Sequence, residues 1–404
     1  MGTAIATGAR RWLEPYPVYG SFIDETIGIV ARQTRDTVSF AVGSPAQEAL
    51  RLVGAEELAQ AVIARDGARA LGYGITEGDP ELRDLIAADA RARGVNATAD
   101  QVIVTAGALQ AIDLACRLFI RPGDVAVVES PGFTNALSAL RNHGARVLEV
   151  PADDDGLDVA AAARLLSESA VRAKLFFVVP NFQNPTGATL SATRREMLVA
   201  LAHDQRAVIV EDDPYRLLRY RGSDLPSLAS LAGDVMVIQT GSFSKTFLPG
   251  IRVGWAIADP ELVRAMAAAK QTMDSSTSSL GQRLVVEFIR RGRFAAHVDA
   301  LRVLYAEKQA RARAALARDF AGTGVGWNDP EGGFYLWVTL PRSASARQLL
   351  GAALEEGVAF VPGDAFAIER DHSAALRFSY SSPTPERIDE GVRRLRRAFD
   401  RVVT

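Results

Sequence analysis

Lysine, the residue that supplies a reactive side-chain amine, is rare in this sequence. The chain carries 46 lysine and arginine residues, but lysine occurs only at positions 174, 245, 270 and 308. An amine catalyst must sit on a rigid turn among neighbours that keep part of it deprotonated. Lys245 fits this requirement best, because it follows an apolar strand in the segment GSFSKTFLPGIRVGW, between hydroxyl residues. The other three lysines are expected to be solvated, on helices or at strand edges.

The surroundings of Lys245 favour a phosphate site. Ser242 and Ser244 precede it, and Arg252 follows seven residues later. Hydroxyl groups donate hydrogen bonds to phosphate oxygens, and a guanidinium can contact them bidentately. An exposed loop lysine would have similar neighbours, so these residues alone leave both interpretations open.

Two further segments place polar groups after apolar runs. Val208–Tyr215 runs from a buried strand directly into acidic residues. A carboxylate there could keep a pyridinium nitrogen protonated, although acids before a proline also start turns. The segment Asn184–Gly187 is either a turn or the source of an amide donor for a ring oxygen.

A scaffold for these groups is indicated between residues 50 and 290, where short β-rich runs alternate with helical ones. The pattern is typical of an α/β fold with a mixed, mostly parallel sheet and helices on both faces. Ligands bind at the carboxyl ends of such strands, where several runs here end in polar or glycine-containing signatures. The sequence predicts seven strands, at Val102–Thr105, Val125–Glu129, Arg146–Val150, Leu175–Val179, Val208–Glu211, Val235–Gln239 and Val253–Ile257.

The last third of the chain has a different pattern. A charged helical region at about 284–319 is followed by strand candidates and an arginine-rich helix, which predicts a small α+β domain. We expect an N-terminal arm and part of the small domain over residues 1–45, a large domain over 46–290, and the rest of the small domain over 291–404. The predicted elements of the small domain are strands at Phe334–Leu340, Val358–Val361 and Leu376–Tyr380, and a helix from Pro385 to Phe399.

Composition narrows the choice of partners. A formal net charge of −2 creates no field that would gather nucleic acid or an anionic membrane, which leaves small molecules as the default. The four histidines are scattered, so no metal site is expected, and the single Cys116 is expected in the core. The N-terminus lacks the apolar core of a signal peptide, and no uncharged apolar run reaches about 18 residues, which favours a cytoplasmic location.

Several motifs occur together in one order. They are LGYGITEG, TAGALQ, ESPGF, PNFQNPTG, EDDPY and TGSFSK. In this the chain resembles the fold-type I, class I/II aminotransferases, above all the branch with 2-aminoadipate aminotransferases and the aminotransferase-like domains of certain bacterial regulators. The resemblance extends from about Ser21 to Leu395. It implies pyridoxal 5'-phosphate as cofactor and transfer of an α-amino group from an amino acid to a 2-oxo acid.

The resemblance also implies roles around the cofactor ring. Lys245 would form the internal aldimine and later shuttle a proton between the substrate and the cofactor. Asp212 would pair with the pyridine nitrogen, and Tyr215 and Asn184 would hydrogen-bond the phenolic oxygen. Phe133 would stack on the ring.

The phosphate would be bound by residues from several segments. The backbone amides of Ala108 and Leu109 open a helix and would act with Ser242 and Arg252. Tyr73 resembles the tyrosine that reaches the phosphate of the neighbouring subunit. A homodimer with shared active sites is therefore expected.

The expected substrate contacts are fewer. Arg377 matches the family's clamp for the α-carboxylate, and Gly43 lies in the N-terminal loop near the substrate. Asn184 would also face the substrate. The strand segment Phe334–Trp337 is interpreted as packing.

One position departs from the family pattern. An early helix of the 2-aminoadipate enzymes carries Ser-x-Ile-Arg-Glu, whose arginine can bind a distal carboxylate, but this sequence has Asp24 at the arginine position. A carboxylate facing the pocket would repel an acidic side chain and favour a cationic or hydroxyl-bearing substrate. An acid placed there for the helix dipole is the alternative. Arg32 and Arg35 could supply a displaced cation.

Other reactions share this cofactor and scaffold. The alternative to transamination is a non-transaminating enzyme of specialised biosynthesis, acting by β/γ-elimination or replacement or by carbon–carbon bond formation. A regulator that only senses the cofactor is disfavoured, because the residues before the match contain no helix-turn-helix pattern.

Overall fold

The largest sheet of the chain has eight strands. The computed structural model describes residues 19–20, 28 and 36–403. The strand order is β2-β9-β8-β7-β6-β3-β4-β5. Strands β8, β7, β6, β3 and β4 are parallel, whereas β9 is antiparallel to both of its neighbours. The bounds are β2 Val102–Thr105, β3 Val125–Ser130, β4 Arg146–Asp153, β5 Gly156–Leu157, β6 Ala173–Val178, β7 Val208–Asp212, β8 Val237–Ser242 and β9 Gly254–Ile257.

The seven predicted strands are present, and the mixed, mostly parallel α/β architecture is confirmed. The prediction missed β5, which pairs antiparallel with the end of β4. A strand of two residues carries no alternation of apolar and polar positions, so the sequence contains no signal for it.

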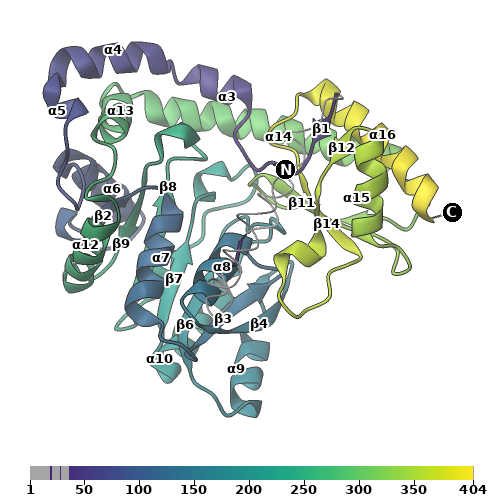
Figure 1. The fold of residues 1–404 in the computed structure, drawn as a ribbon, viewed down its shortest axis with the longest axis horizontal. Coiled ribbons are helices and arrows are strands. Elements are labelled where there is room, and N and C mark those ends of the chain that lie inside the picture. The colour runs from purple at the N-terminus through teal and green to yellow at the C-terminus, as the bar shows by residue number, and fades with distance from the viewer. Residues whose placement is uncertain (1–18, 21–27, 29–35, 404) are drawn as a thin grey trace, which may run out of the picture.

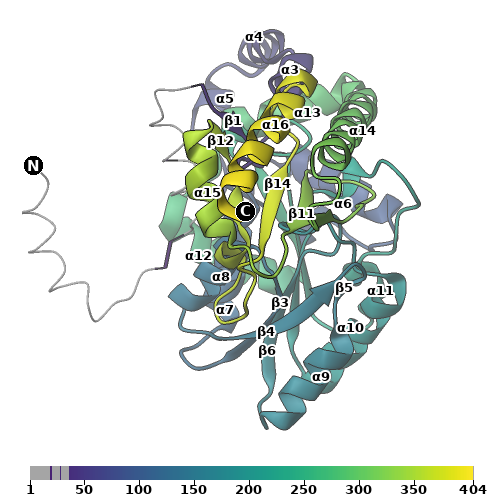
Figure 2. The same ribbon diagram turned by 90° about the vertical axis from the view of Figure 1, so that its right-hand side faces the viewer.

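Helices cover both faces of this sheet because its strands are apolar on both sides. Val128 and Phe177 pack with α7, α8 and α12, whereas Val127 and Phe176 pack with α9, α10 and α11. Successive residues of a strand point to opposite faces, so neighbouring side chains enter different cores. Figure 2 shows α7 and α8 on one side of the strands and α9 and α10 on the other. The bounds are α7 Ala108–Phe119, α8 Thr134–Asn142, α9 Val159–Glu168, α10 Ala192–Gln205, α11 Leu228–Leu231 and α12 Pro260–Asp274.

Further helices cover β2 and β9 on the face opposite α7 and α12. Apolar side chains of α4, α6 and α13 pack there against β2 and β9, in a core that includes Val62, Ile86, Val104, Trp255 and Phe288. These helices lie at one end of the molecule in Figure 1. The bounds are α3 Gln47–Leu52, α4 Ala55–Asp66, α5 Ala68–Leu71, α6 Pro80–Ala92 and α13 Ser279–Arg290.

The C-terminal part forms the predicted α+β unit. Four antiparallel strands in the order β10-β11-β14-β13 lie beside a short parallel pair, β1 and β12. The long helix α14 supplies Tyr305 to the core of the large sheet and Leu316 to that of the small one (Figure 1). The bounds are β1 Val38–Ser39, α14 Arg293–Asp319, β10 Gly326–Trp327, β11 Tyr335–Thr339, α15 Ala346–Glu355, β12 Val358–Ala359, β13 Val361–Pro362, β14 Ala375–Ser379 and α16 Pro385–Val403. The domain boundaries at residues 45 and 290 stay a prediction.

The interpretation of two lysines as solvated is wrong. Lys270 and Lys308 are both fully buried, and each forms an ion pair, with Asp274 at 2.8 Å and with Glu48 at 3.1 Å. Lys270 follows the buried Val263 and Ala267 at helical spacing, so it lies on the inward face of α12. Burial of a lysine in such a position requires a paired acid.

Three further findings concern the described residues as a group. Cys116 is buried, as expected. Within residues 36–403 no helix is long and apolar enough to cross a membrane. The same residues contain no group of three or more histidine, cysteine or acidic side chains that could hold a metal ion.

Candidate active site

Two neighbouring strands end in predicted site residues. β7 ends at Asp212 and leads to Tyr215, and β8 ends at Ser242 and leads to Lys245. Because β7 and β8 are parallel, both ends meet at one edge of the sheet. They line a cavity of about 300 Å³. The other predicted residues that line it are Gly43, Ala108, Leu109, Phe133, Asn184, Arg252 and Arg377.

Asp212 is a buried carboxylate with little support. Thr240 Oγ1 donates a hydrogen bond of 2.7 Å to its Oδ1, and only 3% of the residue is exposed. Burial raises the pKa of the carboxyl to about 7, and repulsion from Asp213 adds to this, whereas Thr240 and Lys245 act in the opposite direction. The groups around the carboxyl therefore stabilise its charged form only in part.

Lys245 reaches into the cavity from the turn after β8. Its Nζ donates a hydrogen bond of 2.9 Å to the carbonyl oxygen of Gly43. Burial lowers the pKa of the Lys245 ammonium, and the guanidinium groups of Arg377 and Arg252 lower it further. A fraction of the amine is therefore deprotonated at a lower pH than in an exposed lysine, as a nucleophile or base requires.

The N-terminus of α7 and Arg252 meet in the lining of the cavity. Gly107 precedes the helix with φ +85°, and a Cβ at this position would lie 2.3 Å from Arg252 Nη2. Only glycine therefore lets the guanidinium approach the helix terminus. The first amides of the helix, including those of Ala108 and Leu109, have no intrahelical acceptor, so amides and guanidinium together form an anion cradle.

Arg377 lies on β14, and two of its three side-chain nitrogens donate hydrogen bonds. Its Nη1 donates to Asn184 Oδ1 at 2.8 Å and its Nη2 to the carbonyl oxygen of Ala41. Its Nε is buried and has no hydrogen-bond partner among the described residues. Because Oδ1 of Asn184 is engaged by the guanidinium, the amide nitrogen of Asn184 is the donor that remains for a ligand.

Tyr335 is a site residue that sequence reasoning missed. It was assigned to packing, but it lines the cavity, and its hydroxyl lies 2.9 Å from the hydroxyl of Tyr215. The available signal was a tyrosine within an otherwise apolar strand, because a buried tyrosine hydroxyl needs a hydrogen-bond partner. Ser244, expected near a phosphate, and Ser44, in the expected loop beside Gly43, also line the cavity. Further lining residues that were not predicted are Val42, Asn135, Val179, Pro214 and Pro249.

Two predicted residues are not part of this cavity as the structure describes it. Tyr73 is 93% exposed and lies in a separate surface hollow with residues 276–280. Asp24 lies outside the described residues, as do Arg32 and Arg35.

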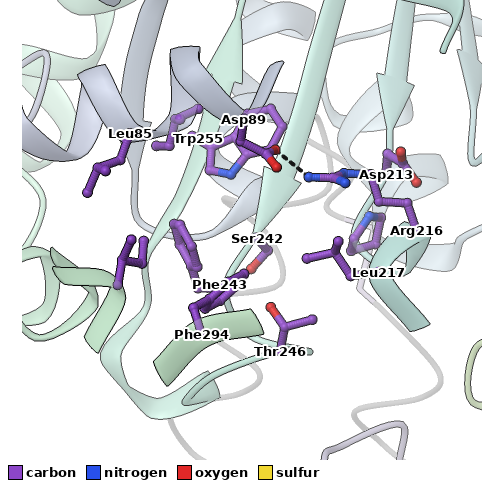
Figure 3. A pocket seen from close by; sticks show the side chains of 13 residues that line it. Leu85, Asp89, Asp213, Arg216, Leu217, Ser242, Phe243, Thr246, Trp255 and Phe294 are labelled. Carbon is purple, nitrogen blue, oxygen red and sulfur yellow. Dashed lines mark hydrogen bonds and ion pairs between the residues drawn. The ribbon is translucent and has the colours of Figure 1, made fainter. Parts of the chain in front are cut away.

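A second cavity of about 230 Å³ shares Ser242 and Pro214 with the first as lining residues. Figure 3 shows its largely apolar lining, with Phe243, Trp255 and Phe294 around the space and the ion pair between Arg216 and Asp89 at its side. Ser242 is the one predicted site residue among those that line it. Most of the predicted site residues therefore line the first cavity.

Comparison with known proteins identifies the family. Residues 35–395 match the family model described as aminotransferase class I and II. The 2-aminoadipate transaminase of Thermus thermophilus is 38% identical over 98% of this chain and 96% of its own length. The aromatic-amino-acid aminotransferase 1 of Thermococcus litoralis is 35% identical over 90% of this chain and 88% of its own length.

A solved structure agrees with these relatives. The α-aminoadipate aminotransferase of Thermus thermophilus, complexed with N-(5'-phosphopyridoxyl)-L-leucine, superimposes with a TM-score of 0.88. It is 36% identical, and the match covers 97% of this chain and 99% of that one. The comparisons favour transamination over the non-transaminating alternative. This chain belongs to the class I and II aminotransferases, with a fold of type I, pyridoxal phosphate as cofactor, and amino acids and 2-oxo acids as substrates.

Proposed function

We propose that Lys245, Asp212 and Tyr215 carry out transamination in the first cavity, on a substrate whose α-carboxylate is bound by Arg377. The observation that carries this assignment is the meeting of three incompletely paired groups around one space. These are an amine with a lowered pKa, a carboxyl with a raised pKa, and a guanidinium with an unpartnered Nε.

The phosphate end of the cofactor fits the cradle beside α7. The amides of Ala108 and Leu109 and the guanidinium of Arg252 would bind its oxygens, with Ser242 as a hydroxyl donor. The contact between Gly107 and Arg252 supports this assignment, since a side chain at position 107 would fill the space.

The ring end fits the buried polar groups. Asp212 would accept a hydrogen bond from a protonated ring nitrogen, whose positive charge would further stabilise the carboxylate. Asn184 and Tyr215 would donate to the phenolic oxygen, and Phe133 would cover one ring face. When bound, pyridoxal phosphate withdraws electrons from the substrate's Cα through its protonated ring.

The remaining residues act on the substrate. Arg377 would bind the α-carboxylate through its free Nε, with Asn184 fixing the guanidinium in place. Lys245 would hold the aldehyde carbon of the cofactor through Nζ. When a substrate amine displaces it, the free Nζ would take the proton from the substrate's Cα, and its lowered pKa makes it a base for that transfer.

A half-reaction tests this function. Addition of an amino donor to the cofactor-loaded protein should convert the aldehyde form of the cofactor to the amine form, with a matching yield of 2-oxo acid. Lys245→Ala should slow this conversion by at least about 100-fold, the lower range for loss of a general base. Arg377→Met should raise the donor concentration needed for half-maximal rate, and Arg221→Met, an exposed arginine paired with Asp329, is the matched control. Retention of the wild-type rate in Lys245→Ala would refute the assignment.

The donor class is a separate proposal. Asp24 is predicted to disfavour acidic side chains, and the same half-reaction run with different donors tests this. Fast conversion with glutamate and 2-aminoadipate, and none with basic or neutral donors, would contradict it.

We also propose that two copies of the chain share their active sites, and that the protein acts in the cytoplasm. The support for a dimer is the exposure of large apolar residues near the hollow that contains Tyr73. Leu71, Tyr73 and Ile75 are 65%, 93% and 51% exposed, and single-copy exposure of adjacent apolar residues is typical of an interface. In the dimer Tyr73 would reach the phosphate of the partner copy.

A further inference from the structure

Tyr335 lines the first cavity and has no role in the proposed function. It lies on β11 and is only 2% exposed. Its ring lies 4.6 Å from the guanidinium carbon of Arg377, on the neighbouring strand β14. Both residues are therefore fixed by one rigid pair of strands.

The hydroxyl of Tyr335 makes two close approaches. It lies 2.9 Å from the hydroxyl of Tyr215, and the two rings meet edge to face at 5.8 Å. It also fills the space beside Gly43, because a Cβ on this glycine would lie 2.0 Å from the hydroxyl oxygen. The glycine is thus in direct contact with the phenol.

The loop that contains Gly43 is held in place by β14 and the residues after it. Ser379 Oγ donates to the carbonyl oxygen of Val42 at 2.9 Å, and Ser381 Oγ donates to that of Ser44 at 2.7 Å. The carbonyl oxygen between them, that of Gly43, accepts the hydrogen bond from Lys245 Nζ. Tyr335 therefore touches a partner of the catalytic lysine on one side and Tyr215 on the other.

We propose that the Tyr335 hydroxyl is a positioning group that aligns Tyr215 with the cofactor's phenolic oxygen. This inference rests on the proposed function. It adds a residue that acts through Tyr215.

The direction of the hydrogen bond follows from where negative charge is stabilised. Each phenol has one proton to donate. If Tyr215 donates to the phenolic oxygen of the cofactor, its own oxygen must accept the proton of Tyr335. Burial raises the pKa of Tyr215 well above its usual range, so it stays a donor. Donors in series strengthen one another, so Tyr335 makes Tyr215 a stronger donor.

This chain of donors has a spectroscopic consequence. Lys245 Nζ, when bonded to the cofactor, would lie near the phenolic oxygen. A stronger hydrogen bond to that oxygen draws negative charge away from Nζ, which then binds its proton less tightly. Tyr335→Phe keeps the ring and removes only the hydroxyl. It should raise the apparent pKa of the cofactor's visible absorbance band, titrated without substrate, by about 0.3–1 unit, roughly a twofold to tenfold change in the dissociation constant.

The double variant separates positioning from packing. Tyr215→Phe should raise the same apparent pKa by more than Tyr335→Phe does. Tyr215→Phe/Tyr335→Phe should match Tyr215→Phe alone, because Tyr335 acts through Tyr215. Tyr380→Phe is the control, since Tyr380 is a fully buried tyrosine whose hydroxyl donates to the carbonyl oxygen of Gly333 at 2.9 Å, and it does not line the cavity. Its titration should equal that of the wild type.

Replacement of Tyr335 by 3-fluorotyrosine gives a second measurement with little risk to folding. The fluorinated phenol is a stronger donor of the same shape, so the apparent pKa should fall below that of the wild type. Three outcomes would overturn the inference. The apparent pKa could stay unchanged in both replacements, it could shift in the same direction in both, or the shifts of the two phenylalanine variants could add in the double variant. Failure of the proposed function would be distinguishable. In that case the cofactor's visible absorbance band would persist unchanged in Lys245→Ala, a variant that leaves Tyr335 intact.

Discussion

Asp212 shows how a site residue can lower the stability of the protein that carries it. Burial raises the pKa of its carboxyl to about 7 in the folded chain, whereas an unfolded chain would ionise it near 4. The folded state then binds more protons between these values, so the contribution of Asp212 to stability falls as the pH rises from about 4 to about 7. The cost is fully present above pH 7.

Asp212→Asn should therefore stabilise the cofactor-free protein at pH 8, by an amount on the order of a few kcal/mol, and the gain should shrink as the pH is lowered towards 5. Denaturant unfolding at both pH values measures this difference. The exposed Asp100→Asn is a control and should show no such gain. The same Asp212→Asn protein should bind the cofactor more weakly. Equal stability of variant and wild type at pH 8 would contradict the raised pKa.

At the residue scale, the pattern of the sequence located groups at or after the ends of strands, whereas Arg377, inside β14, was identified only through the family resemblance. Lys245, Asp212 and Asn184 could be predicted because polar residues after apolar runs meet at one edge of a parallel sheet. Tyr335 could not be assigned in this way, because it lies inside an apolar strand of another sheet and meets Tyr215 only through the tertiary fold. Its hydroxyl was the one clue to a buried polar partner.

At the scale of elements, β8 shows why the observed bounds of a strand differ from the predicted ones. Its predicted range was Val235–Gln239, but the strand runs from Val237 to Ser242. Gly241 and Ser242 resemble loop residues, yet they pair with Trp255 and Gly254 of β9, and the indole of Trp255 fills the space where a Cβ of Gly241 would lie. Pairing with another strand overrides the low strand propensity of these residues, and the sequence of one segment does not reveal that pairing.

The start of α6 allows a test of a local signal. Asp79 precedes Pro80, and its Oδ1 accepts hydrogen bonds from the amides of Glu81 at 3.0 Å and Leu82 at 3.3 Å. Its Oδ2 also lies 2.6 Å from Arg283 of α13. Asp79→Ala should lower the free energy of unfolding by about 1–2 kcal/mol, because the helix loses its N-cap.

Asp79→Asn is the matched variant, since asparagine keeps the cap and loses only the charge that faces Arg283. In urea unfolding, Asp79→Asn should lower the free energy of unfolding by clearly less than Asp79→Ala does. Equal losses in both variants would mean that the ion pair, and not the cap, provides the stabilisation.

At the scale of the whole molecule, our proposal of shared active sites requires a second copy of the chain. Leu71→Asp should shift the protein from dimer to monomer in sedimentation and weaken cofactor binding, because a charge would be buried in an apolar contact and Tyr73 would lose its place in the partner site. Val303→Asp, at another exposed apolar position, is the control and should leave the dimer intact. A wild-type protein that sediments as a monomer while fully active would contradict the shared site.

The large-scale organisation could be predicted only in outline. The alternation of strands and helices indicated the α/β sheet, and the change of pattern after residue 320 indicated the small α+β unit. The point of division is harder to read, because α14 packs on both cores as one continuous helix. A helix that bridges two cores leaves no linker signal in the sequence.

The central claim is that Lys245 is the residue that holds the cofactor. Reduction of the cofactor-loaded protein with borohydride fixes the cofactor to its lysine, and peptide mass spectrometry then locates it. We predict a single phosphopyridoxyl group on Lys245, because Lys270 and Lys308 are buried in ion pairs elsewhere and Lys174 is exposed. Modification of any of those three lysines in place of Lys245, or of none, would contradict it.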